Sequence, residues 1–214
     1  MYVQDLFAEH RQAELFALIA QHPLGAVVTT RSSGVEVDHL PCSTHPEIGA
    51  QGTIRCHVAR GNPLWRALIE NNSVMIVFQG PNAYISPTWM PGRKRHGKVA
   101  PSWNYAVVHA YGSARVIEDA AWLRKHLRDL SAPQEAHRSD RWSLDEAPEE
   151  FVAQLLNYIV GIEITVERLV GKWFVGQQRS PSDREGVMSG LLQESTEAAT
   201  AIAAMMRAYA PPAP

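Results

Sequence analysis

Residues 52–78, which read GTIRCHVARGNPLWRALIENNSVMIVF, carry most of the information about the fold. The alternating segment Gly52–Ala59 is typical of a half-buried strand. Asn62 and Pro63 mark a helix start, because asparagine caps free backbone N–H groups and proline suits the first helical position. The apolar run Ser73–Phe78 is typical of a central strand. The stretch therefore predicts a strand, a short helix over 64–70 and a second strand.

Further segments with strand character surround this stretch, at residues 25–30, 35–42, 83–86, 104–118, 161–169 and 173–175. Turns are predicted at Ser32–Gly34, Gly80–Asn82 and Val170–Lys172. Short helices interrupt the strands without regular strand–helix alternation. This order predicts a mainly β, antiparallel barrel with helices around it and argues against a doubly wound sheet.

Helical patterns are predicted over residues 5–21, 120–130, 149–158 and 184–193. Ser182 and Glu185 have the spacing of a capping box at the start of the last helix. Residues 1–192 are predicted to form a single domain. The alanine- and proline-rich residues 193–214 are predicted to be a frayed helix or a disordered tail.

Composition limits the function classes. The formal net charge of −2 and the isoelectric point near 6.5 do not favour a protein that mainly binds DNA, since such proteins usually carry a basic excess. The basic segment Arg93–Lys98 leaves a local DNA contact open. No apolar run approaches the ~20 residues that a membrane-spanning helix needs. The N-terminal segment does not resemble a signal peptide, and Cys42 and Cys56 are too few for a disulfide framework, so a cytoplasmic protein is expected.

The sequence contains no phosphate-binding glycine loop, nucleophile elbow or His-Glu-x-x-His pair, and it identifies no catalytic residue. His39 and His57 on predicted strands offer two metal ligands without a third, so no metal site is predicted.

Four polar and aromatic segments stand at predicted strand ends: residues 39–41, 55–63, 102–105 and 172–179. Arg60 precedes a helix N-terminus whose free N–H groups favour an anion. A structural alternative stays open, with Asn62 as a helix cap, Arg60 as a surface charge and Trp173 as a core residue. Composition and spacing thus predict a fold class and no function.

Longer motifs make the chain resemble the PaiB family of FMN-binding proteins from about residue 1 to residue 192. They are HLP (39–41), GTIRCHVARGNPLW (52–65), VMIVFQGPNAYISPTW (74–89), VAPSWNYAVVHAYGSARVIED (99–119), IVGIEITVERLVGKW (159–173) and QQRSPSDREGVMSGL (177–191). The resemblance implies an antiparallel Greek-key split barrel, the fold of the pyridoxamine-phosphate oxidase-like flavoproteins. It also implies a homodimer that holds FMN in a groove between subunits.

The resemblance assigns flavin-binding roles residue by residue. His39, Leu40 and Pro41 would present backbone to the flavin ring, and His57, Arg60 and Asn62 would approach the phosphate and ribityl chain, with Arg60 on the phosphate. Asn104 and Tyr105 would border the ring. The pocket would be closed by Lys172, Trp173, Gln177, Gln178 and Arg179. Here Gly176-Gln177-Gln178 stands where the family pattern has Ser-Gln-Asn, and the basic segment 92–98 is longer than expected.

The PaiB resemblance implies a negative transcriptional regulator. The net charge gives no support for direct DNA contact by such a regulator. The alternative is an FMN-dependent oxidoreductase, either an NAD(P)H:flavin reductase or an enzyme like pyridoxamine-phosphate oxidase, in which FMN carries the hydride. A flavin reservoir or redox sensor without either activity is a third class.

Overall fold

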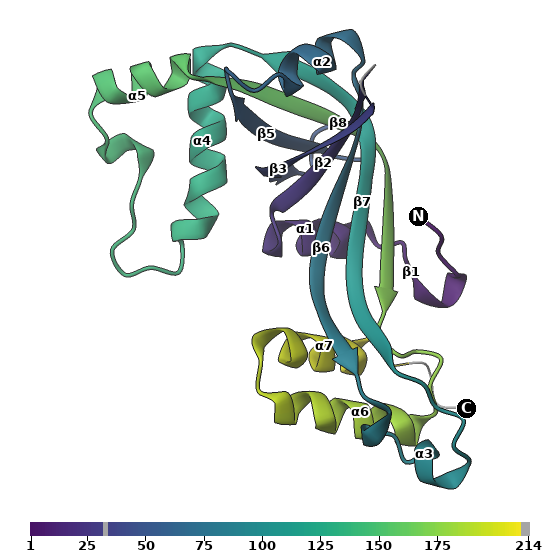
Figure 1. The fold of residues 1–214 in the computed structure, drawn as a ribbon. Coiled ribbons are helices and arrows are strands. Elements are labelled where there is room, and N and C mark those ends of the chain that lie inside the picture. The colour runs from purple at the N-terminus through teal and green to yellow at the C-terminus, as the bar shows by residue number, and fades with distance from the viewer. Residues whose placement is uncertain (32–33, 211–214) are drawn as a thin grey trace. The chain divides into compact units, whose positions relative to one another are not determined.

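The computed structural model describes residues 1–31 and 34–210 (Figure 1). Its strands are β1 (Ala8–Glu9), β2 (Leu24–Arg31), β3 (Gly34–Pro41), β4 (Ser43–His45), β5 (Thr53–Ala59), β6 (Ser73–Ile85), β7 (Ser102–Ile117) and β8 (Ile159–Phe174). They form one sheet in the order β3-β2-β6-β7-β8-β5-β4, and β1 pairs with β8. The β1–β8, β2–β3, β2–β6, β4–β5 and β5–β8 ladders are antiparallel. The predicted antiparallel β architecture with added helices is confirmed.

The helices are η1 (Asp5–Phe7), α1 (Gln12–Gln21), α2 (Leu64–Glu70), η2 (Pro87–Trp89), α3 (Gly92–Arg95), α4 (Ala120–Glu135), η3 (Leu144–Glu146), α5 (Glu149–Asn157), α6 (Pro181–Glu194) and α7 (Glu197–Ala208), where η denotes a 3₁₀ helix. In the described part of the chain, no helix is both long and apolar enough to cross a membrane.

The contacts divide the chain into two compact units, each made of separate segments. Unit 1 comprises Met1–Leu15, Gln79–Val108 and the chain from Val170 onward. Unit 2 comprises Phe16–Phe78 and His109–Leu169. The long strands β6, β7 and β8 each contribute residues to both units.

In unit 2, a single residue joins the two ends of the strand order. β3 pairs with β2 and β4 pairs with β5, yet only Cys42 separates β3 from β4. The register places Pro41 opposite Leu24 and Ser43 opposite Arg55. The chain therefore passes from one ladder to the other within residues 41–43, which we call the barrel seam.

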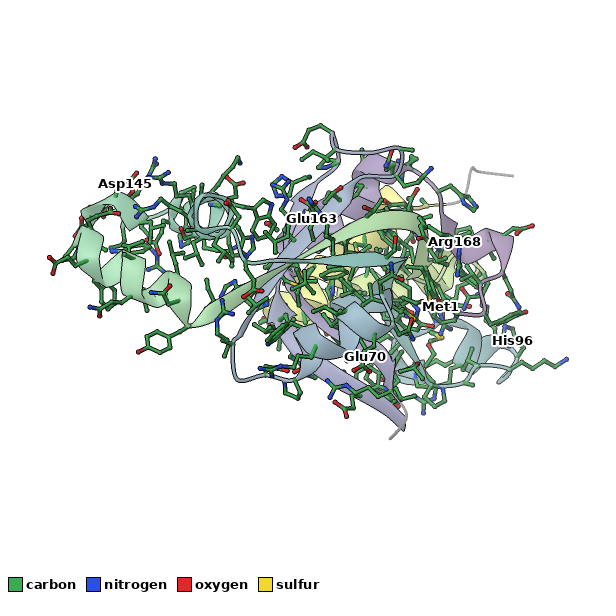
Figure 2. All side chains as sticks on the ribbon, turned by 90° about the horizontal axis from the view of Figure 1, so that it is seen from above. Met1, Glu70, His96, Asp145, Glu163 and Arg168 are labelled. Atoms are coloured by element: carbon green, nitrogen blue, oxygen red, sulfur yellow. The ribbon has the colours of Figure 1, made fainter. Side chains whose placement is uncertain are left out.

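Unit 2 also carries a helical lobe, residues 120–157, in which α5 contacts α4 (Figure 1). Leu123, Leu144, Val152 and Leu156 form its buried cluster. Asp145 lies on this lobe (Figure 2) and pairs with Arg128. On β8, the Glu163 carboxylate accepts from Arg55 at 2.8 Å and from Arg115 at 2.6 Å. The Arg55–Glu163 pair is shielded from water and links β5 to β8, whereas the Arg115 side chain is exposed.

In unit 1, α6 packs against η2 through two glycines. A Cβ atom at Gly186 would lie 2.1 Å from the Trp89 carbonyl oxygen, and one at Gly190 would lie 2.3 Å from the Trp89 ring. Only glycine permits approaches this close. The buried Arg184 of the same helix donates to the Val175 carbonyl at 3.3 Å and to the Met206 carbonyl. These contacts fasten α6 and α7 to the rest of the unit.

Three local predictions are corrected by the structure. Residues 5–21 are not one helix, because β1 pairs with β8 between η1 and α1. The turn predicted at Gly80–Asn82 is absent, since β6 continues through it as one strand. The turn predicted at Val170–Lys172 is also absent, because β1 pairs with this part of β8 and keeps it extended. In each case pairing within the sheet outweighs the local helix or turn propensity.

Helix α6 begins about one turn earlier than the helix predicted over residues 184–193. Ser180, not Ser182, caps α6, since its hydroxyl accepts from the Asp183 N–H and Pro181 occupies the first turn. The segment predicted as a frayed or disordered tail contains α7, in which Ala199, Ile202, Ala203 and Met206 are buried. Residues 211–214 of that segment, and Ser32 and Ser33 of the turn predicted at 32–34, lie outside the described residues.

Candidate functional site

The residues predicted to bind flavin fall into two groups, one in each unit. The group in unit 2 consists of His39, Leu40, Pro41, His57, Arg60 and Asn62. The group in unit 1 consists of Asn104, Tyr105, Lys172, Trp173, Gln177, Gln178 and Arg179.

In unit 2, Asn62 links the β3 segment to the start of α2. Its Nδ2 donates to Asp38 Oδ1 at 2.8 Å, and its Oδ1 accepts from the Leu64 N–H at 2.8 Å. The helix begins at Leu64 with Pro63 as its N-cap residue, and the Asn62 side chain accepts from the N–H of that first helical residue. His39 and Pro41 are exposed and Leu40 is buried, at one end of the strand order. The asparagine therefore holds the neighbourhood of the predicted flavin-contacting backbone in place.

Arg60 lies at the end of β5 with every guanidinium nitrogen engaged. Nε donates to the Asn157 carbonyl at 2.9 Å, Nη2 donates to the Ile159 carbonyl at 3.3 Å, and Nη1 pairs with Glu118. In this structure Arg60 thus hydrogen-bonds to the backbone where α5 ends and β8 begins. A phosphate at Arg60 would compete with the Glu118 carboxylate for this guanidinium.

His57 contacts a partner that the sequence did not identify as a site residue. Its Nδ1 lies 3.0 Å from His126 Nε2, and the two rings meet edge to face. Burial lowers the pKa of His57, and burial together with the nearby His57 lowers the pKa of His126 to about 3. Both rings are therefore neutral at neutral pH. A histidine on the apolar face of the predicted helix 120–130 was the available signal for His126.

In unit 1, the alternation of the strands separates the predicted residues onto two faces. Tyr105 stacks on Phe174 with ring centroids 5.8 Å apart. Lys172 Nζ lies 5.5 Å from the Tyr105 centroid and 5.9 Å from the Phe174 centroid. We call these three half-exposed side chains the aromatic–lysine patch. Phe174 was not among the predicted residues, although its place two residues after Lys172 puts it on the same face.

Asn104 and Trp173 lie on the buried face. Trp173 is buried and packs near Tyr209, with ring centroids 6.4 Å apart. Asn104 is 0% exposed, and neither polar atom of its carboxamide has a partner among the described residues. A buried amide without partners costs free energy, so this group calls for a ligand or water that completes it.

The segment after β8 mixes structural residues and one candidate cation. Gln177 donates to the Trp173 carbonyl at 2.6 Å and accepts from the Val175 N–H at 2.9 Å, which closes the turn. Gly176 has a φ of 78°, which explains glycine where the family pattern has serine. Arg179 donates to Ser102 Oγ at 2.7 Å and points Nη1 at the Met90 sulfur, 3.0 Å away. Its Nε is unpaired among the described residues, and Gln178 is exposed.

This set of side chains fits a flavin in chemical kind. The aromatic–lysine patch offers a π face and a cation, and the Asn104 carboxamide offers a donor and an acceptor of the kind that the ring edge needs. No group of three or more histidine, cysteine or acidic side chains placed for a metal occurs in the described residues.

Comparison with known proteins identifies the family. Residues 1–168 match the family model described as "Putative FMN-binding domain". The uncharacterized protein AN0679 of Emericella nidulans is 33% identical over 242 residues, which cover 97% of this chain and 96% of that protein. The Protease synthase and sporulation protein PAI 2 of Bacillus subtilis is 30% identical over 206 residues, 96% of each chain.

A solved structure supports the fold. The FAD and heme binding protein from Mycobacterium smegmatis superposes with a TM-score of 0.56 at 16% identity, over 86% of this chain and 80% of that one. At this identity the likeness concerns the fold alone, and the predicted split barrel is confirmed. The chain belongs to the PaiB-like family of FMN-binding domains, and its cofactor is FMN.

Proposed function

We propose that this protein is an FMN-binding regulatory protein of the PaiB type that works as a homodimer. The observation that carries the proposal is the contact of Tyr105 with Lys172 and Phe174 in a chain of the FMN-binding family. A half-exposed aromatic pair beside a cation suits a planar, anionic cofactor. The regulatory role is supported by the Bacillus subtilis relative, whose name associates it with protease synthesis and sporulation.

In this proposal, the contacts with FMN are assigned within each unit separately. The aromatic–lysine patch packs against the isoalloxazine ring. Arg60 and Asn62 serve the phosphate and ribityl chain, with Arg60 exchanging Glu118 for the phosphate. When bound, FMN supplies reversible electron acceptance, and the protein supplies binding and orientation.

Homodimer formation is supported by an aromatic pair exposed on unit 1. Tyr84 is 49% exposed and Trp103 is 56% exposed, and their rings meet edge to face at 6.1 Å. Large aromatic side chains gather at protein interfaces, where their burial contributes much of the binding energy. The family resemblance implies a second copy of the chain as the partner, and we place it on this surface.

Regulation in this proposal does not depend on strong direct DNA binding. The net charge is −2, and Arg95 of the basic segment contacts Ser182 at 2.8 Å and Asp183 at 3.8 Å. Arg93 and Lys94 remain exposed on α3. We therefore expect only weak, salt-sensitive binding to generic duplex DNA.

The test begins with the absorption spectrum of the purified protein and a titration of apoprotein with FMN. We expect saturable quenching of flavin fluorescence with a roughly micromolar or lower Kd. NAD(P)H and duplex DNA are then added separately to the FMN-loaded protein. Steady NAD(P)H oxidation would replace the regulatory assignment with the flavin reductase alternative. Tight sequence-selective binding at physiological salt would instead indicate a direct repressor, and no response to millimolar FMN would contradict flavin binding itself.

A further inference from the structure

Cys42 lies in the barrel seam, and Cys56 lies on the neighbouring strand β5. The β4–β5 register pairs Thr44 with Ile54 and Ser43 with Arg55. One further step in the same register places Cys42 opposite Cys56. Both cysteines are buried and free of disulfide bonds.

The backbone hydrogen bonds indicate a short distance between the Cα atoms of Cys42 and Cys56. The Cys42 N–H donates to the Pro23 carbonyl at 2.9 Å, so it points toward the β2 side and away from β5. A residue whose N–H points away from its antiparallel neighbour occupies a non-hydrogen-bonded position, where Cα atoms lie about 4.5 Å apart. That separation lies within the range of about 4.4–6.8 Å that a disulfide requires. The seam thus provides the backbone geometry for a bond between the two sulfurs.

The two thiols are not equivalent. Cys42 donates to the Leu40 carbonyl at 3.4 Å and lines a cavity of about 110 Å³ with Ser43, His45 and Asp129 among its neighbours. Cys56 is 0% exposed. A hydrogen bond to Cys42, together with burial, raises the pKa of the Cys56 thiol. Cys42 is therefore the sulfur that a small reagent in the cavity meets first, and Cys56 lies behind it.

We propose that Cys42 and Cys56 form a peroxide-sensitive dithiol that a small hydroperoxide converts into a disulfide across the β4–β5 ladder. The sulfur of Cys42 attacks the peroxide oxygen, the O–O bond breaks, and the thiol proton leaves with the departing hydroxide as water. The sulfur of Cys56 then attacks the sulfenic acid at Cys42, and the second water departs with the Cys56 proton. Two thiols and one hydrogen peroxide thus give one disulfide and two waters.

The disulfide would change β3, the strand predicted to contact the flavin, as well as the seam. The Cys42 thiol proton that now bonds to the Leu40 carbonyl would be lost. Leu40 belongs to the segment predicted to present its backbone to the flavin. Oxidation of the pair would therefore be sensed two residues away on β3.

The test uses the full chain and hydrogen peroxide as the probe. After peroxide treatment, the protein is denatured, free thiols are blocked with N-ethylmaleimide, and the peptides that contain residues 42 and 56 are weighed. We expect one cross-linked species that carries no maleimide and is about 2 Da lighter than the two reduced peptides together. Dithiothreitol should convert it back into the two reduced peptides. Two maleimide-labelled peptides, or an over-oxidised Cys42 beside a labelled Cys56, would overturn the proposal.

Single variants test the order of reaction, with circular dichroism as the check on folding. In Cys56→Ala, peroxide should produce a sulfenic acid at Cys42 that dimedone traps. In Cys42→Ala, Cys56 should stay unlabelled, because its side chain is 0% exposed and does not line the cavity beside residue 42. Equal dimedone labelling of Cys56 in the folded Cys42→Ala variant would contradict the role of Cys42 as the attacked sulfur.

Discussion

Arg60 and Glu118 form an ion pair that occupies the guanidinium group predicted to hold the FMN phosphate. If Arg60 binds phosphate, the two anions compete for it. Removing the Glu118 charge should then favour FMN.

We predict that Glu118→Gln tightens FMN binding and leaves riboflavin binding unchanged, because only FMN has the phosphate. Arg60→Ala should weaken FMN binding roughly ten- to a hundredfold, the equivalent of one charge-assisted contact. Fluorescence titration of both ligands measures both effects. Arg128→Ala, which removes the ion pair with Asp145 on the helical lobe, is the matched control. Unchanged FMN affinity in both site variants would leave Arg60 with a structural role only.

The aromatic–lysine patch gives a second prediction. Tyr105→Leu should weaken flavin binding roughly two- to tenfold, because one aromatic contact of about 0.5–1.5 kcal/mol is lost. Riboflavin should show the same loss, since the ring is common to both ligands. Tyr111→Leu is the control, because the Tyr111 ring carries the Arg168 guanidinium at 3.8 Å in a similar cation–π contact. Equal effects of the two substitutions would argue against a ring site at Tyr105.

The buried carboxamide of Asn104 leads to opposite expectations for stability and binding. Asn104→Leu should raise the Tm of the apoprotein by several degrees, because it removes polar atoms whose burial costs about 1–3 kcal/mol. The same variant should weaken FMN binding if the flavin completes the amide. Differential scanning calorimetry and flavin titration give the two values. A lower Tm in the apoprotein would mean that Asn104 already has a partner in solution.

The His57–His126 pair predicts a pH dependence of stability. The pKa of His126 is lowered to about 3 in the folded state, so between pH 6.5 and 3 the unfolded chain binds a proton that the folded chain excludes. Stability contributed by the neutral ring is therefore present above pH 6.5 and is lost as the pH falls. Between pH 6.5 and 5 the parent protein should lose about 2 kcal/mol more than His126→Gln. Urea titrations at the two pH values measure this difference, and parallel losses would rule out a depressed pKa at His126.

The exposed Tyr84–Trp103 pair predicts the effect of interface substitutions. Light scattering should give about twice 23.7 kDa for the parent protein. Trp103→Ser should shift the protein toward the monomer mass, because an aromatic anchor is lost. Trp142→Ser is the control, since Trp142 is 46% exposed on the helical lobe. A parent protein that stays monomeric at high concentration would contradict the homodimer.

The sequence predicted correctly those elements whose ends are marked by local signals such as helix-capping residues. The helix α2 occupies the predicted residues 64–70. Asn62 and Pro63 precede its first residue, and the backbone N–H of Asn71, just after its last residue, donates to the Ala67 carbonyl. The same reasoning failed at Gly80–Asn82 and at Val170–Lys172. At both places the turn-forming residues lie within extended strands of the sheet. At Val170–Lys172 the pairing partner is β1, which lies far away in the sequence.

The candidate site shows the same limit. The alternation of β7 and β8 could have separated Asn104 and Trp173 from Tyr105 and Lys172, because neighbouring strand residues point to opposite faces. The His57–His126 contact joins residues 69 positions apart, and the Arg60–Glu118 pair joins residues 58 positions apart. No periodicity encodes such distances, since they follow from how the strands and helices pack together.

The two glycines that receive Trp89 place local and tertiary stability in opposition. In an isolated helix, alanine at Gly186 or Gly190 would be more stable by about 1 kcal/mol per position. In the folded chain the same methyl group would collide with the Trp89 carbonyl oxygen or with its indole ring. Taken alone, helix α6 is therefore less stable than the same helix with alanine at residues 186 and 190 would be. An effort to strengthen it residue by residue would improve the helix and displace the tryptophan that anchors it.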